Sequence, residues 1–553
     1  MACMRIALVN VQLLDGNNVV APLGVLYIAG QLERDGHTVA VFDGDPGAFP
    51  LADEVIAWKP ELVGLGFLTA SSSRAYGLLK VLREKLPSDV YFMAGGVHPT
   101  IFPEPTLRLG ADVVVTGEGE ETASEVVRRV ASGNRDMAGV AGTVCLAADG
   151  TVVDNGARAL MPELSDLPRP ARHLIDFTPY LAPPGVIRGY SMGKVATVFS
   201  TRGCPYGCIY CGSHNIFGRK IRYRPVEDVV DEITELRTTY GVRGIYFCDD
   251  LFTLDKQWVL DFCQELNRRL PGKIKWGCQT RIDAVHLDIL RTMKEAGCVQ
   301  VDFGVESGSQ RILKILSRKT PKEKILQAFR TAQSVGLRTC ATFIIGSPEE
   351  QADDLEQSFQ LAKDLRADFT AFYYATPYPG TKLWDLAVEN EWIDPAADFD
   401  ENWTHRQPNR PVLTINFTAD ELIAHRKRMA NPFFLRNFVR LRNVPFYGEL
   451  LLAALRYPDT IPRALLAAYR SRRLEDAVEL LFSRYQYKKY KEGYDKTDGM
   501  RKAAARIVRA PSEVSESTRR LADKQTPSYP SGHRTGDLPG AARKPALLRV
   551  VGG

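Results

Sequence analysis

The sequence has no long apolar run, few cysteines and no strong excess of one charge. Its apolar stretches all fall short of the ~20 residues that a membrane-spanning helix needs, so an integral membrane protein is not expected. The net charge of +5 is small for 553 residues and gives no support to nucleic acid as a partner. Ten cysteines spread over the whole chain are too sparse for a disulfide scaffold.

The first residues also lack the layout of a secretory signal peptide, because the apolar run that starts at Met4 ends at once in a polar loop. We therefore expect a cytoplasmic protein, in a compartment that keeps thiols reduced. With 45% apolar residues, a chain of this length has enough material for several buried cores.

Three cysteines do stand together. Cys204, Cys208 and Cys211 form a C-x3-C-x2-C pattern in Thr201-Arg-Gly-Cys-Pro-Tyr-Gly-Cys-Ile-Tyr-Cys211, just after the apolar run 195–199. Three thiolates on one loop can hold three irons of a cubane cluster and leave the fourth iron open to a small molecule. The other seven lie mostly in apolar runs and are expected to be structural: Cys3, Cys145, Cys248, Cys263, Cys278, Cys298 and Cys340.

A zinc site is the less favoured alternative for this loop. His214 lies three residues after the last cysteine and could supply a fourth ligand. A structural zinc loop usually takes its second pair of ligands from a distant C-x2-C or H-x3-H, and the sequence has none. The pattern therefore favours an iron–sulfur cluster.

Residues 4 to about 130 alternate β-branched runs with amphipathic segments near 23–35, 71–85 and 118–131, which predicts a doubly wound parallel sheet. Such a sheet binds ligands at the carboxyl ends of its strands, where this chain has many glycines. The glycines alone fit a ligand crevice and simple tight turns equally well. The expected strands are Arg5 to Val11, Thr38 to Phe42, Leu62 to Phe67, Val90 to Ala94 and Asp112 to Val115.

A hairpin is expected at 143–155, around Asp149-Gly150, and a proline-rich linker at 162–184. From 194 to about 378, strands and helices alternate again, which predicts an open six-unit relative of the β/α barrel with its site at the carboxyl ends of the strands. The cysteine loop follows the first of these strands. The expected strands are Val195 to Ser200, Gly244 to Cys248, Lys275 to Gln279, Cys298 to Phe303, Arg338 to Ile345 and Phe369 to Ala375.

Residues 400–495 are expected to be mainly helical and differ in composition from the rest. Between Leu422 and Arg473 there are eleven Lys or Arg residues against only Glu449 and Asp459, interleaved with apolar side chains. Such a face can rest on anionic lipid headgroups, which would favour an apolar substrate such as a polycyclic lipid or a porphyrin. A helical cap that closes the barrel is the favoured alternative, because periodicity does not separate a core face from a membrane face.

The cysteine pattern, with the aromatic Tyr210 directly before the third cysteine, resembles the signature of the radical S-adenosylmethionine (radical SAM) enzymes. The resemblance implies that the methionine amino and carboxylate groups chelate the open iron. It also implies that the reduced cluster cleaves the sulfonium and gives a 5′-deoxyadenosyl radical, which abstracts hydrogen from a small-molecule substrate. The expected partner is an electron donor such as flavodoxin or ferredoxin.

Polar residues at the barrel strand ends are candidates for binding S-adenosylmethionine. Asp249 and Asp250 follow the second strand and could bind the methionine amino group or start a helix, two interpretations of equal weight. Arg281 follows the third strand and could pair with the methionine carboxylate.

Other strand ends match the family's motifs. By resemblance, Glu306 and Ser307 form the ribose-binding motif after the fourth strand. Gly346 matches the glycine step on which adenine rests, and Pro379 and Gly380 match the turn after the last strand.

Four amino-terminal motifs resemble, in matching order, the cobalamin-binding domain that precedes the barrel in one branch of this superfamily. They are Pro22-Leu-Gly-Val-Leu-Tyr-Ile-Ala29, Gly36-His-x-Val39, Gly95-Gly-x-His98 and Gly117-Glu-Gly-Glu120. The residues assigned to cobalamin on this basis are Pro22, Leu23, Gly24, Thr69, Gly95, Gly96, His98, Gly117, Glu118 and Gly119.

Many corrinoid domains supply a histidine to cobalt through a D-x-H-x2-G motif. The nearest match here, Asp35-Gly-His37-Thr-Val-Ala40, ends in alanine and lies at the wrong edge of the sheet. His37 is therefore expected to be a turn residue, and by resemblance cobalt is expected to bind without a protein histidine below it.

The resemblance thus implies an enzyme with a 4Fe–4S cluster, S-adenosylmethionine and cobalamin. Methyl transfer to an unactivated carbon is the favoured reaction: one S-adenosylmethionine methylates cobalamin and a second gives the radical. Oxidative cyclisation or rearrangement, as in anaerobic porphyrin ring closure, and a corrinoid-binding sensor or carrier are the alternatives. The expected regions are a cobalamin-binding domain at 1–140, hairpin and linker at 141–193, partial barrel at 194–400, helical region at 401–500 and disordered tail at 501–553.

Overall fold

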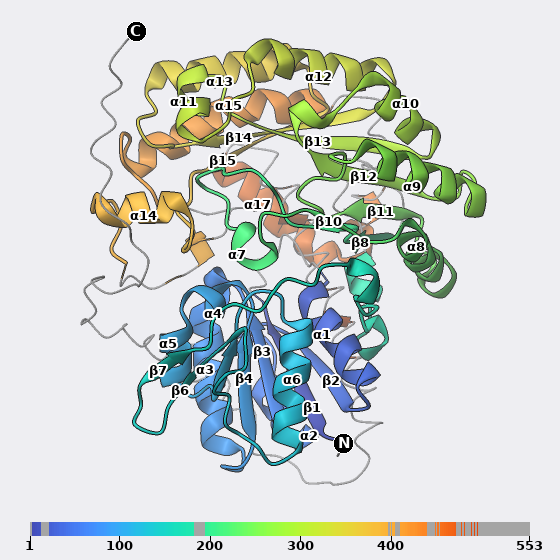
Figure 1. The fold of residues 1–553 in the computed structure, drawn as a ribbon. Helices are drawn as coiled ribbons and strands as arrows, with labels where there is room; N and C mark the ends of the chain where they lie inside the picture. Colours follow the sequence, from blue (N-terminus) through green and yellow to red (C-terminus); the bar gives the residue numbers. More distant parts are fainter. Residues whose placement is uncertain are drawn as a thin grey trace.

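The computed structural model describes residues 3–12, 21–181, 194–395, 399, 401–403, 410–438 and 454–471, with a few further positions between 448 and 495. Two mainly parallel sheets, each covered by helices, form the body of the protein (Figure 1). The predicted tail at 501–553 and the end of the predicted linker lie outside the described residues. Within the described ranges, no helix has both the length and the apolar character that crossing a bilayer requires.

The amino-terminal sheet has the strand order β2-β1-β3-β4-β5-β6-β7, and its first five strands are parallel, as predicted. The predicted hairpin pairs antiparallel with β5 and so extends this sheet. The strands are β1 (Arg5–Val11), β2 (Thr38–Gly44), β3 (Leu62–Phe67), β4 (Tyr91–Gly95), β5 (Val113–Val115), β6 (Thr143–Leu146) and β7 (Val152–Asp154).

Helices cover both faces of this sheet, which is why its central strands are apolar throughout. In β1, Ile6 and Leu8 join the core under α1 and α6, whereas Ala7 and Val9 join the core under α2 and α3. The helices are α1 (Leu23–Arg34), α2 (Leu51–Trp58), α3 (Ser72–Lys85), α4 (Val97–Ile101), α5 (Pro103–Arg108) and α6 (Glu120–Ala131).

The second sheet is the predicted six-stranded open barrel, with all strands parallel in the order β15-β14-β13-β12-β11-β8. Its strands are β8 (Val195–Val198), β11 (Gly244–Phe247), β12 (Lys275–Thr280), β13 (Cys298–Glu306), β14 (Arg338–Ile345) and β15 (Phe369–Tyr374). The outer helices are α8 (Val226–Tyr240), α9 (Lys256–Arg269), α10 (Leu287–Glu295), α11 (Gln310–Ile315), α12 (Lys322–Ser334) and α13 (Ala352–Leu365).

Shorter elements connect the two sheets. A small antiparallel pair, β9 (Thr201–Arg202) and β10 (Arg222–Tyr223), and the short α7 (His214–Phe217) flank the cysteine loop. Helix α4, which follows β4, lies against α7, and Figure 1 shows α7 between the two sheets. The carboxyl ends of the amino-terminal strands therefore face the cysteine loop of the barrel.

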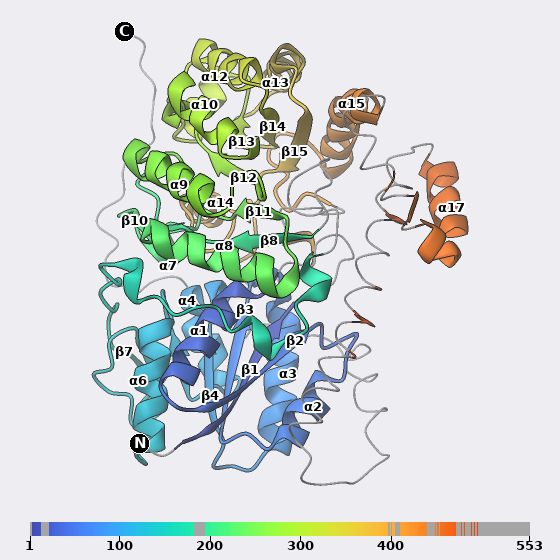
Figure 2. The ribbon, with the colours of Figure 1, turned by 90° about the vertical axis from the view of Figure 1, so that its right-hand side faces the viewer.

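The helical region after the barrel divides into two unlike parts. Helix α15 (Ala419–Phe438) packs along β15, where the Phe433 ring contacts Phe359 and Phe372, and Arg426 donates a hydrogen bond to the Phe372 carbonyl. This part is the helical cap that the sequence favoured. Helix α17 (Ile461–Ser471) lies farther out in Figure 2 and leaves Leu465 63% and Tyr469 83% exposed. The basic and aromatic pattern also included side chains that lie outside the described residues: Phe434, Phe438, Phe446 and Leu450.

Candidate active site

The cysteine loop leaves β9 at the carboxyl end of β8 and is held closely by its neighbours. Gly203 has a φ of +95°, and a Cβ there would lie 2.2 Å from the Lys220 carbonyl oxygen, so only glycine fits. The Cys204 amide donates a hydrogen bond to the Gly218 carbonyl (3.3 Å), and the Cys211 amide donates one to the Cys208 carbonyl (3.2 Å). These backbone contacts fix the loop and leave the three partly exposed thiols available as ligands.

The chemistry of this donor set fits an iron–sulfur cluster. Burial raises the pKa of the Cys204 thiol and raises that of Cys211 to about 11, and the nearby Asp250 carboxylate adds to both shifts. A thiolate in such surroundings needs cationic metal for its stability, and coordination deprotonates the thiol outright. In the part of the chain that the structure describes, no three His, Cys, Asp or Glu side chains are gathered as ligands of one metal ion.

Glu306, the predicted ribose-binding residue, lies next to Tyr210, the aromatic residue of the cysteine signature that was predicted to bind cofactor. The pairing of β13 with β14 is irregular between Gly304 and Glu306, and Glu306 has a φ of +68°. Strained backbone of this kind is concentrated at functional sites. Burial raises the pKa of Tyr210 well above its usual range, and the charge of the neighbouring Glu306 carboxylate and a hydrogen bond with it add to the shift.

Arg318 is a site residue that the sequence analysis missed. Its Nη2 donates hydrogen bonds to Glu306 Oε1 at 2.5 Å and to the Gly304 carbonyl at 3.0 Å. It follows α11 in a segment without a recognisable motif, so the sequence carried no signal for it. The guanidinium group holds the Glu306 carboxylate in one orientation.

Arg281 lies beside the cysteine loop, as predicted from its place after β12. Its guanidinium group stacks on the Tyr206 ring at 3.7 Å and donates two hydrogen bonds to Asp283, each 2.9 Å long. These bonds use Nε and Nη2, and no described residue accepts a hydrogen bond from Nη1. One edge of the guanidinium group is thus available for a ligand carboxylate.

The two neighbouring aspartates do different work. Asp249 is 1% exposed, and its carboxylate accepts hydrogen bonds from the Ser200 amide (2.7 Å), the Thr201 amide (2.8 Å) and the Ser200 hydroxyl. It therefore fixes the turn that leads into the cysteine loop, and its predicted contact with the methionine amino group is not supported. Asp250 accepts a hydrogen bond from the Ser213 hydroxyl and is the carboxylate that lies near the cysteines.

The turns after β13 and β14 are held by their own side chains. Ser307 is fully buried, and its hydroxyl contacts the Ser358 hydroxyl and accepts a hydrogen bond from the Ser309 amide, so it shapes the turn. Its contact with a ribose stays a prediction. Glu350, which was not predicted, accepts hydrogen bonds from the amides of Gly346 (2.6 Å) and Ser347 (3.1 Å). The sequence feature that could have indicated Glu350 is an acidic residue four positions after Gly346. The predicted Pro379 is buried beside Gly380, whose carbonyl accepts from Asn215 of α7.

Glycines dominate the edge of the amino-terminal sheet that faces the barrel. Gly95 at the end of β4, Gly96 after it, and Gly117 and Gly119 after β5 are all at least partly exposed there. Leu68, after β3, is 60% exposed. Three adjacent strands thus present backbone and apolar surface, which suits a large flat cofactor. The other predicted positions differ: Pro22 and Leu23 are buried, Gly24 is exposed, and Thr69 is buried in a short 3-10 helix at 69–71.

Three polar residues of this domain form hydrogen bonds or ion pairs with other residues of the protein. The fully buried His98 imidazole bonds to the Tyr76 hydroxyl (2.9 Å) and packs against aromatic rings, so its predicted contact with cobalamin stays a prediction without support from its side chain. The Glu118 carboxylate binds arginines of the barrel. His37 Nδ1 accepts from the Met4 amide at the opposite edge of the sheet, which confirms it as a turn residue.

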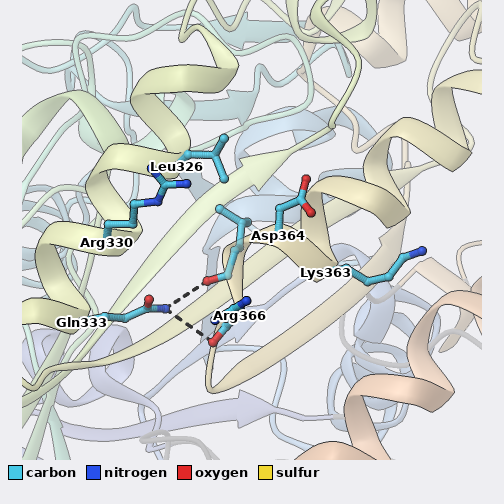
Figure 3. Close-up of a pocket in the computed structure, with 7 residues that line it drawn as sticks. Leu326, Arg330, Gln333, Lys363, Asp364 and Arg366 are labelled. Carbon is cyan, nitrogen blue, oxygen red and sulfur yellow. Dashed lines mark hydrogen bonds between the residues drawn. The ribbon is translucent and has the colours of Figure 1, made fainter.

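A crevice of about 550 Å³ lies between α12 and the end of α13 (Figure 3). Its walls are mostly polar, and the Gln333 amide donates hydrogen bonds to the carbonyl oxygens of Leu365 and Arg366. These residues precede β15, at the edge of the barrel opposite the cysteine loop. The crevice is therefore separate from the candidate active site.

Comparisons with known proteins agree with this division of the chain. Residues 11–127 match the B12 binding domain, and residues 198–362 match the radical SAM superfamily. An uncharacterized methyltransferase of Pyrococcus horikoshii is 31% identical over 79% of this chain and 92% of its own length. The anaerobic magnesium-protoporphyrin IX monomethyl ester cyclase of Rubrivivax gelatinosus is 29% identical over 69% of each chain. The structure of the radical S-adenosylmethionine methyltransferase TsrM from Kitasatospora setae, with cobalamin and a 4Fe–4S cluster bound, superposes with a TM-score of 0.58 at 20% identity, covering 71% of this chain and 80% of that one.

Proposed function

This chain belongs to the cobalamin-binding radical SAM enzymes, and from that premise we propose that it transfers a methyl group to an unactivated carbon of a small-molecule substrate. The observation that carries the proposal is that the glycine-lined edge of the amino-terminal sheet faces the three-cysteine loop of the barrel. A 4Fe–4S cluster, S-adenosylmethionine and cobalamin would supply the electron, the radical and the methyl carrier. A substrate held between the two edges is within reach of both chemistries.

Each edge has a defined task in this proposal. Cys204, Cys208 and Cys211 hold the cluster, and the Glu306 carboxylate accepts hydrogen bonds from ribose hydroxyls beside Tyr210. Arg281 binds the methionine carboxylate, and Gly346 and Pro379 shape the floor for adenine. The loops with Gly96 and Gly117 support the corrin ring by close backbone approach.

Two guanidinium groups surround the central cysteine of the loop. The charges of Arg281 and Arg318 both lie near Cys208, within interaction distance of its thiol. Positive charge at this point stabilises an anionic cluster and attracts the carboxylate of the incoming nucleoside. The protein therefore orients S-adenosylmethionine with its methionine end toward the open iron.

The test is product analysis with reconstituted, chemically reduced protein and S-adenosylmethionine carrying a trideuterated methyl group. Methyl transfer predicts two nucleoside products, S-adenosylhomocysteine and 5′-deoxyadenosine, and a substrate mass that increases by one labelled methyl group. Reduced protein with a full cluster that forms neither nucleoside would contradict the proposal.

Oxidative cyclisation is the second candidate, because the cyclase relative matches over 69% of both chains. Cyclisation consumes S-adenosylmethionine to 5′-deoxyadenosine but forms no S-adenosylhomocysteine, and the product loses hydrogen or gains oxygen. A corrinoid sensor or carrier would bind cobalamin and form neither nucleoside. The nucleoside ratio and the product mass together separate the three functions.

The proposal includes a cytoplasmic location and an electron donor such as flavodoxin or ferredoxin, since reducing surroundings preserve both thiols and cluster. It also includes peripheral membrane contact through α17 and the segment before it, where large apolar side chains are exposed among arginines. Sedimentation with anionic vesicles should exceed that with zwitterionic vesicles, and Leu465→Glu should remove the difference. The exposed apolar residues are Leu451, Leu452, Leu455, Leu465, Leu466 and Tyr469.

A further inference from the structure

Two arginines of the barrel region and two glutamates of the amino-terminal domain form a buried ion-pair group, here called the interdomain clamp. Arg222 donates one hydrogen bond to each carboxylate oxygen of Glu118, both 2.8 Å long. Arg202 donates to Glu120 at 2.5 Å and to Glu118 at 3.3 Å. All four side chains are at most 9% exposed.

The clamp lies a few residues from both proposed cofactor sites. Glu118 stands between Gly117 and Gly119 in the loop after β5, and Glu120 begins α6. Arg202 precedes Cys204 by two residues, and β9 pairs Arg202 directly with Arg222 of β10. A movement of either side of the clamp is therefore a movement of a cofactor-binding loop.

The arginines are themselves held in place. Arg222 also donates hydrogen bonds to the carbonyl oxygens of Met161 and Phe217, each 2.9 Å long. The Arg202 guanidinium lies 5.3 Å from the ring of Tyr27 on α1 and 5.3 Å from that of Phe217 on α7. The donors are thus oriented before they meet the glutamates, which makes the contact between the domains directional.

Net stability does not explain such a group. Removing four charges from water offsets most of their mutual attraction, and an apolar contact of equal size would hold the domains at least as well. Apolar surfaces can slide over one another, whereas a bidentate arginine–carboxylate pair is satisfied in only one geometry. What the charges add is a fixed relative position.

We propose that Arg202, Arg222, Glu118 and Glu120 are positioning residues that hold the corrinoid-binding loop after β5 at one distance and orientation from the cysteine loop. This inference rests on the proposed function, since the distance matters only if both loops hold cofactors. Reacting centres that are displaced by about 1 Å can lose a hundredfold in rate, so a methyl carrier and a radical source that share one substrate need this constraint.

The first test uses the purified protein without added cofactors and measures amide hydrogen exchange. Glu120→Gln removes one charge of the clamp and keeps the shape of the side chain. Breaking a buried ion pair destabilises the closed contact enough to shift its opening equilibrium by more than about tenfold. Amide exchange in residues 116–120 and 199–203 should therefore become at least about tenfold faster.

Glu232→Gln is the matched control. Glu232 is fully buried and accepts hydrogen bonds from Arg172 and Arg224, each 2.6 Å long, but none of these residues belongs to the amino-terminal sheet. Its loss should destabilise the barrel and leave the exchange ratio between residues 116–120 and the rest of the amino-terminal domain unchanged. Equal effects of the two variants on residues 116–120 would mean that the clamp is ordinary packing.

The second test measures geometry in the loaded protein by electron paramagnetic resonance, with cob(II)alamin and the reduced cluster as the two spins. The original protein should show one defined magnetic interaction between them. Arg202→Lys, which keeps the charge but loses the forked donor, should give a weaker or spread interaction with corrinoid content and 5′-deoxyadenosine formation retained.

The outcomes separate the clamp from the proposed function. If Glu120→Gln and Arg202→Lys leave both exchange and spin interaction as in the original protein, the inference is wrong and the function stands. If the original protein takes up neither cluster nor corrinoid, the proposed function is wrong, and the exchange experiment still decides whether the clamp fixes the domains.

Discussion

The two sheets of this protein offer opposite kinds of surface at their carboxyl-end edges, where we propose that the ligands bind. The amino-terminal sheet ends in glycines and an exposed leucine, and its polar side chains are engaged within the protein, as His98 and Glu118 show. The barrel ends in thiols, a carboxylate and two guanidinium groups around one loop. In the proposed function, one edge would therefore bind its ligand by shape and the other by specific donor atoms.

The difference follows from what each ligand brings. A corrin carries its own metal and its own polar groups, so the protein needs only a flat surface that it can approach closely. A cluster and a small charged nucleoside need ligands and counter-charges at fixed points. Substitutions at the barrel edge should then impair the cluster and nucleoside cleavage, and substitutions at the amino-terminal edge should impair corrinoid binding.

The largest effect is expected at the barrel edge, from Cys208→Ala. A cluster with two protein ligands should not persist, so its visible absorbance and all 5′-deoxyadenosine formation should be lost. Corrinoid binding should remain, because that edge shares no ligand with the loop. The exposed Cys3 is the control, and Cys3→Ala should keep the cluster. Retained nucleoside cleavage in Cys208→Ala would refute the assignment of the loop.

Glu306→Gln should lower kcat/KM for 5′-deoxyadenosine formation by about tenfold to a hundredfold, since a hydrogen bond to a charged group contributes about 1.5–3 kcal/mol. Arg318 also loses its charged partner in this variant. Glu349→Gln is the control, because Glu349 has a similar φ of +60° but an exposed side chain. Equal kinetics in both variants would remove Glu306 from the nucleoside site.

Gly96→Ala should lower the stability of the amino-terminal domain and its affinity for corrinoid, and should leave the cluster unchanged. Its φ of +99° and the Phe67 carbonyl oxygen 2.9 Å from the added Cβ combine strain with a clash. Strain costs about 1–2 kcal/mol and overpacking about 1–3 kcal/mol more. Gly150→Ala carries the same strain in open space, so urea unfolding and corrinoid titration of the two variants isolate the clash. Unchanged corrinoid affinity in Gly96→Ala would place the cofactor elsewhere.

The smallest effect concerns His98, whose pKa burial lowers from 6.5 to about 3. The unfolded chain binds a proton below about pH 6.5 that the folded protein excludes, so stability falls as pH decreases through this window. One histidine accounts for about 2 kcal/mol between pH 7 and pH 5. His98→Gln should reduce the difference in the free energy of unfolding between pH 7 and pH 5, measured by urea titration, by that amount. An identical pH dependence of the free energy of unfolding in both proteins would contradict the burial of a neutral imidazole.

The sequence predicted both sheets because their strands are short, mostly apolar runs that alternate with helix-length segments. It missed α2, whose eight residues are too few to show a clear helical period. It also could not separate Asp249 from Asp250: adjacent residues at a strand end point in opposite directions, and only the backbone geometry shows which one faces the loop.

Contacts between distant segments were also not predicted from the sequence. Arg318 reaches Glu306 through the turn after α11, and Arg202 and Arg222 meet Glu118 across more than eighty residues of chain. No local pattern marks such pairs, because each residue alone resembles a solvated charge. The family motifs indicate the loops of the candidate site, and the folded chain determines which side chains of those loops already have partners within the protein.

The central claim is that the three-cysteine loop holds a cluster with one iron open to S-adenosylmethionine. The most direct measurement is electron–nuclear double resonance of the reduced cluster with S-adenosylmethionine labelled with ¹⁵N in the amino group and ¹⁷O in the carboxylate. We predict coupling from both labels to the cluster, which Cys208→Ala should abolish. Four protein donors around a lone metal ion in this loop, with no coupling from either label, would contradict the account.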